Sequence, residues 1–280
     1  MIVSTDNGPL YFEIDGEGPP LVFVSGWAMS CECWRPAVSL LKRTHRCLIY
    51  DLRGVARSQP VSLKATFTIE DHADDLHTLL DEVQIFDATI VGHEMGSLIA
   101  AVDAIRHPQD LSSLVVVSPR EGLSADAVRN LAVFTPASLA LRELAGYPFL
   151  RHLVARRFRR APQPIRDRLF HDFAELSPRA AYETALSASS GEASNALDEL
   201  VARSSSVLFI CGEKDKKGAA EARRLFAQTQ AGKLATMRDC GFLPMLEYRR
   251  QFVKLVEDFA KTQQRTVNRR SILTVDSQHD

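Results

Sequence analysis

Short apolar runs recur along the chain, and stretches with helical spacing separate them. Runs that are apolar throughout, without alternation, are typical of strands covered on both faces. The predicted strands span 10–14, 21–24, 47–50, 89–91, 114–117, 207–210 and 234–237. The run at 10–14 has the pattern of a half-exposed strand, and the run at 234–237 is the weakest. The pattern therefore predicts a mainly parallel sheet.

The segments between these runs carry apolar residues at helical spacing. The predicted helices span 34–42, 69–83, 95–105 and 251–260. Thr68 is the expected cap of the second helix, and Asp71, Asp74 and Asp75 are expected on its solvent face. The third helix should end at His107, because proline follows it. Alternating strands and helices predict an α/β fold with an open, doubly wound sheet.

Residues 122–203 break this alternation, because they are rich in Ala and Leu and are helical in pattern throughout. They are predicted to be a helical insertion between two strands, and at the carboxyl ends of the strands they would form a lid. The predicted organisation is a core of residues 1–121 and 204–262, a helical lid of residues 122–203, and a polar C-terminal tail of residues 263–280 that is frayed or weakly packed.

Composition narrows the class of protein. The 280 residues are 45% hydrophobic and 25% charged with a net charge of −1, so no global field attracts nucleic acid or a membrane. No signal peptide or membrane-spanning run is expected. The cysteines are odd in number and scattered, which favours reduced thiols and a cytoplasmic location: Cys31, Cys33, Cys47, Cys211 and Cys240. Neither a metal nor a cofactor is expected.

The most informative motif is Gly92-His93-Glu94-Met95-Gly96, which lies between the strand at 89–91 and the following helix. Two glycines around a central residue are typical of a nucleophile elbow, a sharp strand-to-helix turn that presents one reactive side chain. Hydrolases carry Ser, Cys or Asp at the centre, whereas this chain carries Glu94. The functional question is therefore what a carboxyl group can do at that point.

Together with the elbow, four further motifs make the chain resemble the α/β-hydrolase superfamily over roughly residues 8–262, closest to its lidded esterase and lyase branches. These motifs are Val24-Ser25-Gly26-Trp27, Asp51-Leu52-Arg53-Gly54, Gly212-Glu213-Lys214-Asp215 and Cys240-Gly241-Phe242-Leu243-Pro244-Met245-Leu246-Glu247. The resemblance implies an oxyanion hole made by the backbone amides of Trp27 and Met95. It also implies that Asp215 stands at the position of the triad acid and Phe242 at that of the triad histidine.

The departures from the family pattern lie at the catalytic positions. Glu94 replaces the nucleophile and Phe242 replaces the histidine, so the catalytic triad is degenerate. Ser25 replaces the usual histidine before Gly26, and Val55 replaces the usual histidine after Gly54. Serine hydrolysis requires a base that takes and returns the hydroxyl proton, which Phe242 cannot do.

A carboxyl group can instead act as a general acid or base. The N-terminus of the following helix favours the anion of Glu94, whereas Phe242, Val55, Met95 and an apolar lid favour the neutral acid. With two preorganised amides, such a group can enolise, eliminate, decarboxylate or cyclise a carbonyl compound. We therefore predict a cofactor-free lyase, isomerase or cyclase that acts on a small apolar carbonyl compound.

Two alternatives remain open at this point. The first is a non-catalytic pseudoenzyme that binds a small ligand or a protein partner. The second is an atypical hydrolase that uses the carboxylate of Glu94 as the nucleophile. In that case an ester intermediate forms, and the base that would release it is missing at position 242.

The remaining residues receive more modest roles. His93 should point to the opposite side of the strand from Glu94 and be packed and hydrogen-bonded. Asp215, without its histidine, is expected to bond backbone amides or an arginine, or to pair with substrate. Ser25 is either a hydroxyl near the oxyanion hole or a space-filler. A basic stretch in the lid is read as a solvated face or as a docking surface for an acidic partner; it comprises Arg151, Arg156, Arg157, Arg159, Arg160, Arg166 and Arg168.

Overall fold

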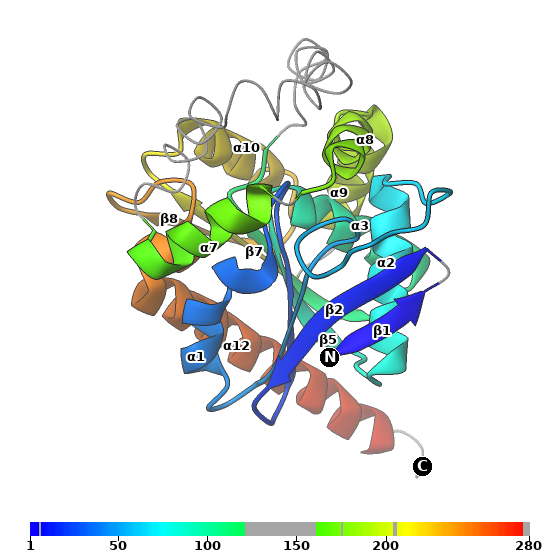
Figure 1. Cartoon of the computed structure of the whole chain (residues 1–280). Helices are drawn as coiled ribbons and strands as arrows, with labels where there is room; N and C mark the ends of the chain where they lie inside the picture. The colour runs from blue at the N-terminus through cyan, green and yellow to red at the C-terminus, as the bar shows by residue number, and fades with distance from the viewer. Residues whose placement is uncertain (6, 121–160, 175, 204–205, 277–280) are drawn as a thin grey trace.

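The computed structural model describes residues 1–5, 7–120, 161–174, 176–203 and 206–276. In these residues the chain forms one sheet with helices on both of its faces (Figure 1). The strands are β1 (Ile2–Thr5), β2 (Gly8–Asp15), β3 (Pro20–Val24), β4 (Arg46–Tyr50), β5 (Ala88–His93), β6 (Leu111–Val117), β7 (Val207–Gly212) and β8 (Lys233–Met237). The helices are the 3-10 helix η1 (Cys31–Cys33) and the α-helices α1 (Arg35–Leu41), α2 (Ile69–Glu82), α3 (Met95–Arg106), α7 (Gln163–Ala174), α8 (Pro178–Ala188), α9 (Gly191–Arg203), α10 (Lys216–Phe226), α11 (Pro244–Glu247) and α12 (Arg249–Asp276).

The sheet is mainly parallel, as the apolar runs predict. Its strand order is β1-β2-β4-β3-β5-β6-β7-β8. The β1–β2 and β2–β4 pairs are antiparallel, and every pair from β4 to β8 is parallel. The carboxyl ends of β3, β5, β6 and β7 therefore meet at one edge of the sheet. The residues that follow those strands, including Glu94, gather there, as they do in other open α/β sheets.

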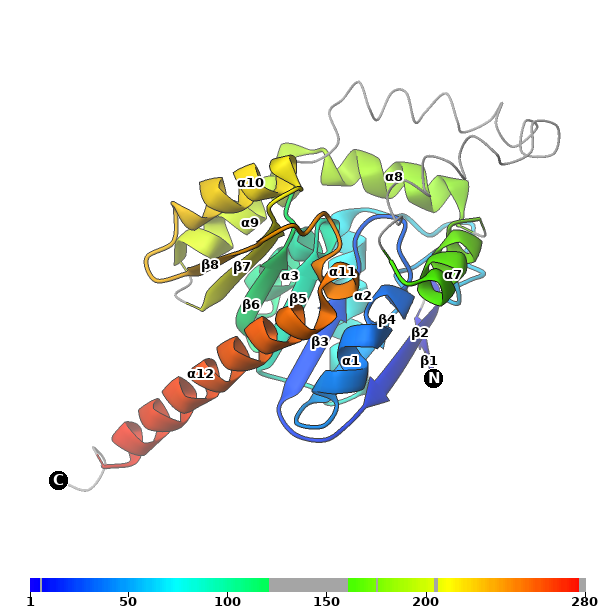
Figure 2. The ribbon, with the colours of Figure 1, turned by 90° about the vertical axis from the view of Figure 1, so that its left-hand side faces the viewer.

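The core has two layers, one on each face of the sheet (Figure 2). Leu79 of α2, Ile99 of α3 and Leu225 of α10 belong to one layer. Trp34 and Phe252 of α12 belong to the other, and both are 0% exposed. Because both faces of the central strands are covered, their sequences are apolar at successive positions.

Helix α2 starts where its sequence signal predicts. The Thr68 Oγ1 accepts a hydrogen bond of 3.0 Å from the Asp71 amide, and the Asp71 carboxylate accepts one of 2.9 Å from the Thr68 amide. This reciprocal arrangement satisfies two amides that a helix start leaves without partners. The prediction that Asp75 faces solvent is wrong. Asp75 is 3% exposed, and its carboxylate accepts hydrogen bonds from Nε and Nη2 of Arg53, at 2.8 and 2.5 Å.

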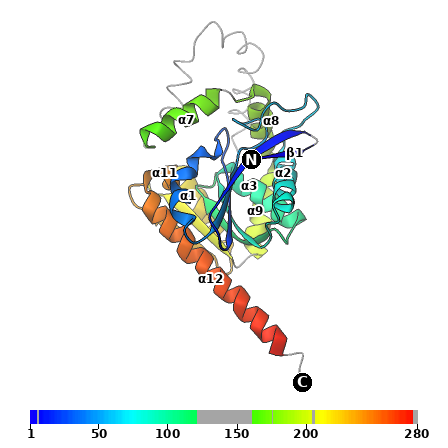
Figure 3. The same ribbon diagram turned by 60° about the horizontal axis from the view of Figure 1, so that its bottom comes forward.

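Several elements differ from the expected ones. Strand β1, helix α10 and the short helices η1 and α11 were not predicted, and the C-terminal helix is longer than the range 251–260. Helix α12 continues through residues expected to be a tail, as far as Asp276, and its last turns project beyond the sheet (Figure 3). Among the described residues, none of the helices combines the length and apolar character needed to cross a membrane.

Helices α7, α8 and α9 follow β6 in the chain and precede β7. They belong to the segment that the sequence suggests is a lid, and α8 and α9 each contact a helix of the core. The indole Nε1 of Trp27 donates a hydrogen bond of 2.9 Å to the carbonyl oxygen of Ala181, which ties α8 to the loop after β3. The first part of the predicted lid, residues 121–160, lies outside the described residues.

Candidate active site

Glu94 stands at the junction of β5 and α3 in a strained backbone conformation. Its φ is 50° and its ψ is −115°, a region that residues with a side chain rarely adopt. The turn closes tightly around it: a Cβ on Gly92 would lie 2.6 Å from the Ser97 amide nitrogen, and a Cβ on Gly96 would collide with the Val24 carbonyl oxygen. Both glycines are therefore required, as expected for a turn that displays one side chain.

The Glu94 carboxylate folds back toward the loop after β3. Its Oε2 accepts a hydrogen bond of 3.2 Å from the backbone amide of Trp27. A Cβ added to Gly26 would lie 2.8 Å from the same oxygen and 2.7 Å from His93 Nδ1, so a larger residue there would displace these side chains. The Trp27 amide, expected to be an oxyanion donor, is thus engaged by the chain's own carboxylate. A substrate oxygen could use this amide only after Glu94 turns away.

A small cavity lies beside this loop. Its lining includes Trp27, Val55 and Met95 from the core and Ala180 and Thr184 from α8. Its volume is about 10 Å³, which accommodates roughly one water molecule. Val55, which the sequence suggests is a pocket residue, is buried at this cavity. In this conformation α8 therefore packs closely over the Met95 side of the elbow.

His93, next to Glu94, and Ser25, next to Gly26, are both fully buried. His93 is 0% exposed, and its Nε2 donates a hydrogen bond of 3.0 Å to the carbonyl oxygen of Phe242. Ser25 is also 0% exposed, and its Oγ accepts a hydrogen bond of 3.1 Å from the Trp34 indole. These contacts give His93 the packed, hydrogen-bonded setting expected from its strand position. They give Ser25 a structural bond rather than a place at the oxyanion loop.

Asp215 caps helix α10 and has an arginine as its charged partner. Its Oδ1 accepts a hydrogen bond of 3.3 Å from the Gly218 amide and forms an ion pair of 2.8 Å with Nη2 of Arg120. Burial raises the pKa of Asp215, Arg120 opposes this effect, and the charges of Glu94 and Glu247 add to it. A backbone amide and an arginine are the partners that we expected for an aspartate without a histidine.

Arg120 also covers the ring of Phe242, the residue predicted to stand at the position of the triad histidine. Its guanidinium carbon lies 4.2 Å from the centroid of the Phe242 ring, which is a cation–π contact. The Phe242 ring also contacts His93, in an edge contact at 4.5 Å between centroids. Sequence reasoning missed Arg120. Its position in the sequence could have indicated it. Arg120 comes shortly after β6, and β6 lies in the sheet between β5, which Glu94 follows, and β7, which Asp215 follows.

A second buried histidine lines the cavity and couples the core to the insertion. His72 of α2 is 1% exposed, and its Nε2 lies 3.1 Å from the Thr184 hydroxyl of α8. Burial and, after it, the charge of Arg53 lower the pKa of His72 to about 3, whereas Asp71 opposes this shift. The folded chain therefore holds His72 neutral where an exposed histidine would begin to take up a proton.

This shift predicts a loss of stability in mild acid. Below pH 6.5 the unfolded chain binds a proton at His72, while the folded chain does not until the pH approaches 3. The free energy of unfolding should therefore fall as the pH decreases through this window, by about 1 kcal/mol between pH 7.0 and 5.5 from His72 alone. Urea unfolding at both pH values measures the loss. In His72→Gln the free energy of unfolding should fall by about 1 kcal/mol less than in the wild-type protein. In His171→Gln, at an exposed site, it should fall by as much as in the wild-type protein. Equal losses in all three proteins would contradict this assignment.

The predicted basic stretch is only partly visible. Arg151, Arg156, Arg157, Arg159 and Arg160 lie outside the described residues, whereas Arg166 and Arg168 belong to α7. Arg168 forms an ion pair of 3.0 Å with Asp172 one turn later. The possibility that an acidic partner docks on this basic stretch stays a prediction.

Comparison with known proteins identifies the sequence family. A family model described as "alpha/beta hydrolase fold" matches residues 19–247. A putative carbamate hydrolase RutD of Variovorax paradoxus is 33% identical over 141 residues, which are 49% of this chain and 51% of that protein. A cis-3-alkyl-4-alkyloxetan-2-one decarboxylase of Shewanella oneidensis is 31% identical over 118 residues, 41% of this chain and 37% of that protein. The chain therefore spans about half the length, or less, of these curated relatives.

Solved structures of the same architecture agree with the fold. An esterase of Thermogutta terrifontis superposes with a TM-score of 0.79 at 20% identity, over 94% of this chain and 99% of that one. An enol-lactonase of Burkholderia xenovorans gives a TM-score of 0.74 at 20% identity, over 93% and 100%. At such identity the likeness concerns the fold alone. The predicted α/β-hydrolase architecture is confirmed.

Proposed function

The chain belongs to the α/β hydrolase fold family, and from this premise we propose that it is a cofactor-free enzyme in which Glu94 transfers a proton to or from a small, partly apolar carbonyl compound. The observation that carries the proposal is the strained φ of 50° at Glu94, which holds a carboxyl group at the point where the family presents its reactive side chain. Residues held in sparsely populated backbone conformations cluster at active sites, and here the strained residue also carries an ionisable side chain.

The bond between Glu94 and the Trp27 amide suggests how the reaction begins. A carbonyl oxygen that enters the oxyanion hole competes with Glu94 Oε2 for this amide. The displaced carboxylate then lies next to the bound carbonyl group, within reach of the hydrogen on the neighbouring carbon. Substrate binding and activation of the base are thereby one event.

The proton transfer can be written in full. The carboxylate of Glu94 removes a proton from the carbon next to the carbonyl group, and the C–H electron pair forms the C=C bond of an enolate. The negative charge collects on the carbonyl oxygen, where the Trp27 and Met95 amides stabilise it. Glu94 then returns the proton to another atom of the enolate, or a leaving group departs. No step requires a histidine at position 242.

The names of two relatives are compatible with this substrate class. A carbamate and an oxetan-2-one both contain a carbonyl group, and the second name describes a decarboxylase, which is not a hydrolase. The serine route of ester hydrolysis, by contrast, requires a hydroxyl and an imidazole, and this chain has Glu94 and Phe242 at those positions.

The proposal is tested without knowledge of the natural substrate. Small ketones, β-keto esters and lactones are incubated with the full chain in D₂O, and the exchange of hydrogen for deuterium beside the carbonyl group is followed by NMR. We expect at least one compound to exchange faster than in buffer. If a compound binds and none exchanges or is converted, Glu94 is not a proton-transfer group for this class.

A non-catalytic binder is the rival that a specific observation favours. The Trp27 amide is already satisfied by Glu94, and the cavity beside Met95 is about 10 Å³. A binder would give saturable ligand binding with no turnover in the wild-type protein or in any Glu94 variant. An atypical hydrolase with a carboxylate nucleophile would instead add the mass of an acyl or alkyl group to the tryptic peptide that contains Glu94.

A further inference from the structure

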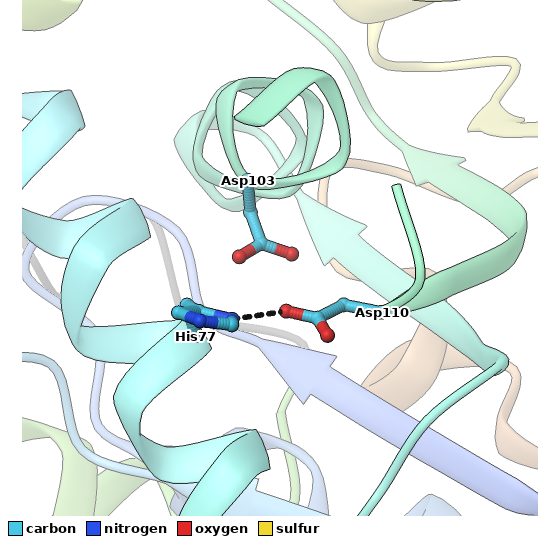
Figure 4. A group of neighbouring side chains, drawn as sticks. All are labelled: His77, Asp103 and Asp110. Carbon is cyan, nitrogen blue, oxygen red and sulfur yellow. Dashed lines mark hydrogen bonds and ion pairs between the residues drawn. The ribbon is translucent and has the colours of Figure 1, made fainter. Parts of the chain in front are cut away.

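A second group of polar side chains gathers far from Glu94. It consists of His77 on α2, Asp103 on α3 and Asp110 in the turn before β6 (Figure 4). Asp103 follows Glu94 by nine residues along α3, which is about 13 Å along a helix. The group lies toward the amino end of β6, whereas the elbow lies at the carboxyl end of β5. It therefore belongs to a site separate from the elbow.

Three carboxylate oxygens in this group have no hydrogen-bond partner. They are both oxygens of Asp103 and Oδ1 of Asp110, and the two residues are 0% exposed. One ligand atom from each of His77, Asp103 and Asp110 can be chosen so that all three lie within 4.8 Å of one another. Figure 4 shows the Asp103 carboxylate directed toward the pair that the other two residues form.

His77 is held in position by the contacts on its ring. Its Nδ1 lies 2.7 Å from Asp110 Oδ2, and its ring stacks on that of His107 with centroids 3.5 Å apart and an interplanar angle of 1°. The His77 side chain is 29% exposed, so solvent reaches the group from this side. Arg106, at the end of α3, donates from its Nη1 to Asp74 at 2.6 Å.

An unpaired buried carboxylate is costly, and native proteins rarely leave one without a partner. A proton is one remedy, and burial together with the charges of Asp110 and Asp74 raises the pKa of Asp103 to about 8. One proton supplies one donor, however, and even if the Asp103 hydroxyl donates to Asp110 Oδ1, the other Asp103 oxygen still has no partner and Asp110 keeps its charge. A cation of charge +2 compensates both carboxylates at once.

We propose that His77, Asp103 and Asp110 bind a divalent metal ion of the zinc class. One imidazole nitrogen and two carboxylate oxygens form a mixed set, which suits Zn²⁺ better than the all-oxygen preference of Ca²⁺ or Mg²⁺. Around Zn²⁺ the ligand atoms stand about 3.3 Å apart. The three side chains therefore have to move about an ångström closer to one another. The hydrogen bond between His77 Nδ1 and Asp110 Oδ2 has to break so that both residues can bind the ion. Such an ion would join α2, α3 and the turn before β6. Because it lies far from Glu94, we assign it a structural role.

The test uses the full chain, stripped with EDTA and then freed of chelator. Calorimetric titration with ZnCl₂ at pH 7.5 should give one site per chain. Thermal unfolding should shift upward by about 5 °C when free Zn²⁺ is a hundredfold above its Kd. Both effects should be absent in Asp103→Asn and in His77→Gln. The matched controls, Asp81→Asn and His171→Gln at exposed positions, should keep the response of the wild-type protein.

The metal-free Asp103→Asn variant separates this proposal from a general loss of folding. Because the amide cannot ionise, it removes the cost of keeping a buried carboxyl group charged or protonated, so its metal-free form should unfold at or above the temperature of the metal-free wild-type protein. If that variant fails to fold, His77→Gln carries the test alone, since His77 is partly exposed. The proposal is overturned if Zn²⁺ leaves the wild-type protein unchanged. It is also overturned if the shift survives in the His77 or Asp103 variant, because the ion then binds elsewhere, for instance at thiols.

Discussion

Replacement of Glu94 by glutamine is expected to lower the rate of carbonyl hydrogen exchange, or of turnover, by about 10² to 10⁴-fold. Glutamine retains the size of the side chain and an oxygen that can accept from the Trp27 amide, so binding of the same compound should change only a few-fold. The loss should therefore appear in kcat and leave the affinity nearly intact. NMR exchange rates and calorimetric affinities for the same compound measure the two quantities.

The control for this prediction is Glu82→Gln, at the exposed end of α2, which should retain full activity. Glu94→Ala adds a distinct outcome. It abolishes turnover and also frees the Trp27 amide from its intramolecular acceptor. A carbonyl ligand should therefore bind to the alanine variant at least as tightly as to the wild-type protein. Undiminished turnover in Glu94→Gln would exclude acid–base catalysis by this residue.

Replacement of Arg120 by methionine is expected to lower the free energy of unfolding by about 2–3 kcal/mol. Asp215 is left as a buried charge, with its side chain 5% exposed and with Glu94 and Glu247 adding repulsion. The expected loss is below that of a fully buried pair because the Arg120 side chain is 32% exposed. Part of the loss is the contact with the Phe242 ring.

A double-mutant cycle checks this account of Arg120. Combination of Arg120→Met with Asp215→Asn should recover part of the stability, because the amide no longer buries a charge. Arg203→Met removes an exposed ion pair with Glu199 and should cost less than about 1 kcal/mol. Urea unfolding of the wild-type protein, Arg120→Met, Asp215→Asn, the double variant and Arg203→Met decides the matter. If Arg120→Met and Arg203→Met cost the same, Arg120 does not neutralise a buried carboxylate.

The positions of the central strands followed from the sequence because their burial on both faces leaves a direct mark. The run Leu21 to Val24 is apolar at successive positions, and the structure pairs it with β4 and β5 on its two sides. Elements on the periphery leave weaker marks. Strand β1 pairs on one side alone, and α10 has a polar composition with a narrow apolar stripe, so neither was predicted.

In the candidate site, too, local features were predicted from the sequence and long-range contacts were not. The two glycines around Glu94 are a local requirement of the turn, so the elbow was visible in the sequence. Asp75 was misplaced because its partner Arg53 is 22 residues away in the chain. Arg120 was missed for a related reason, since 95 residues separate it from Asp215. The partners of a buried charge are set by long-range packing, which periodicity does not report.

By itself, the sequence determined the α/β fold and the turn between two glycines at Glu94, because each depends on neighbouring residues or on ordered motifs. That Glu94, Asp215 and Phe242 stand at the positions of the family's chemistry stays a prediction. Only the tertiary structure decided that Glu94 binds the Trp27 amide, that Arg120 joins Asp215 to the Phe242 ring, and that His77, Asp103 and Asp110 converge. These contacts join segments that the sheet and its helices bring together, and their energy depends on burial and distance, which exist only once the chain has folded.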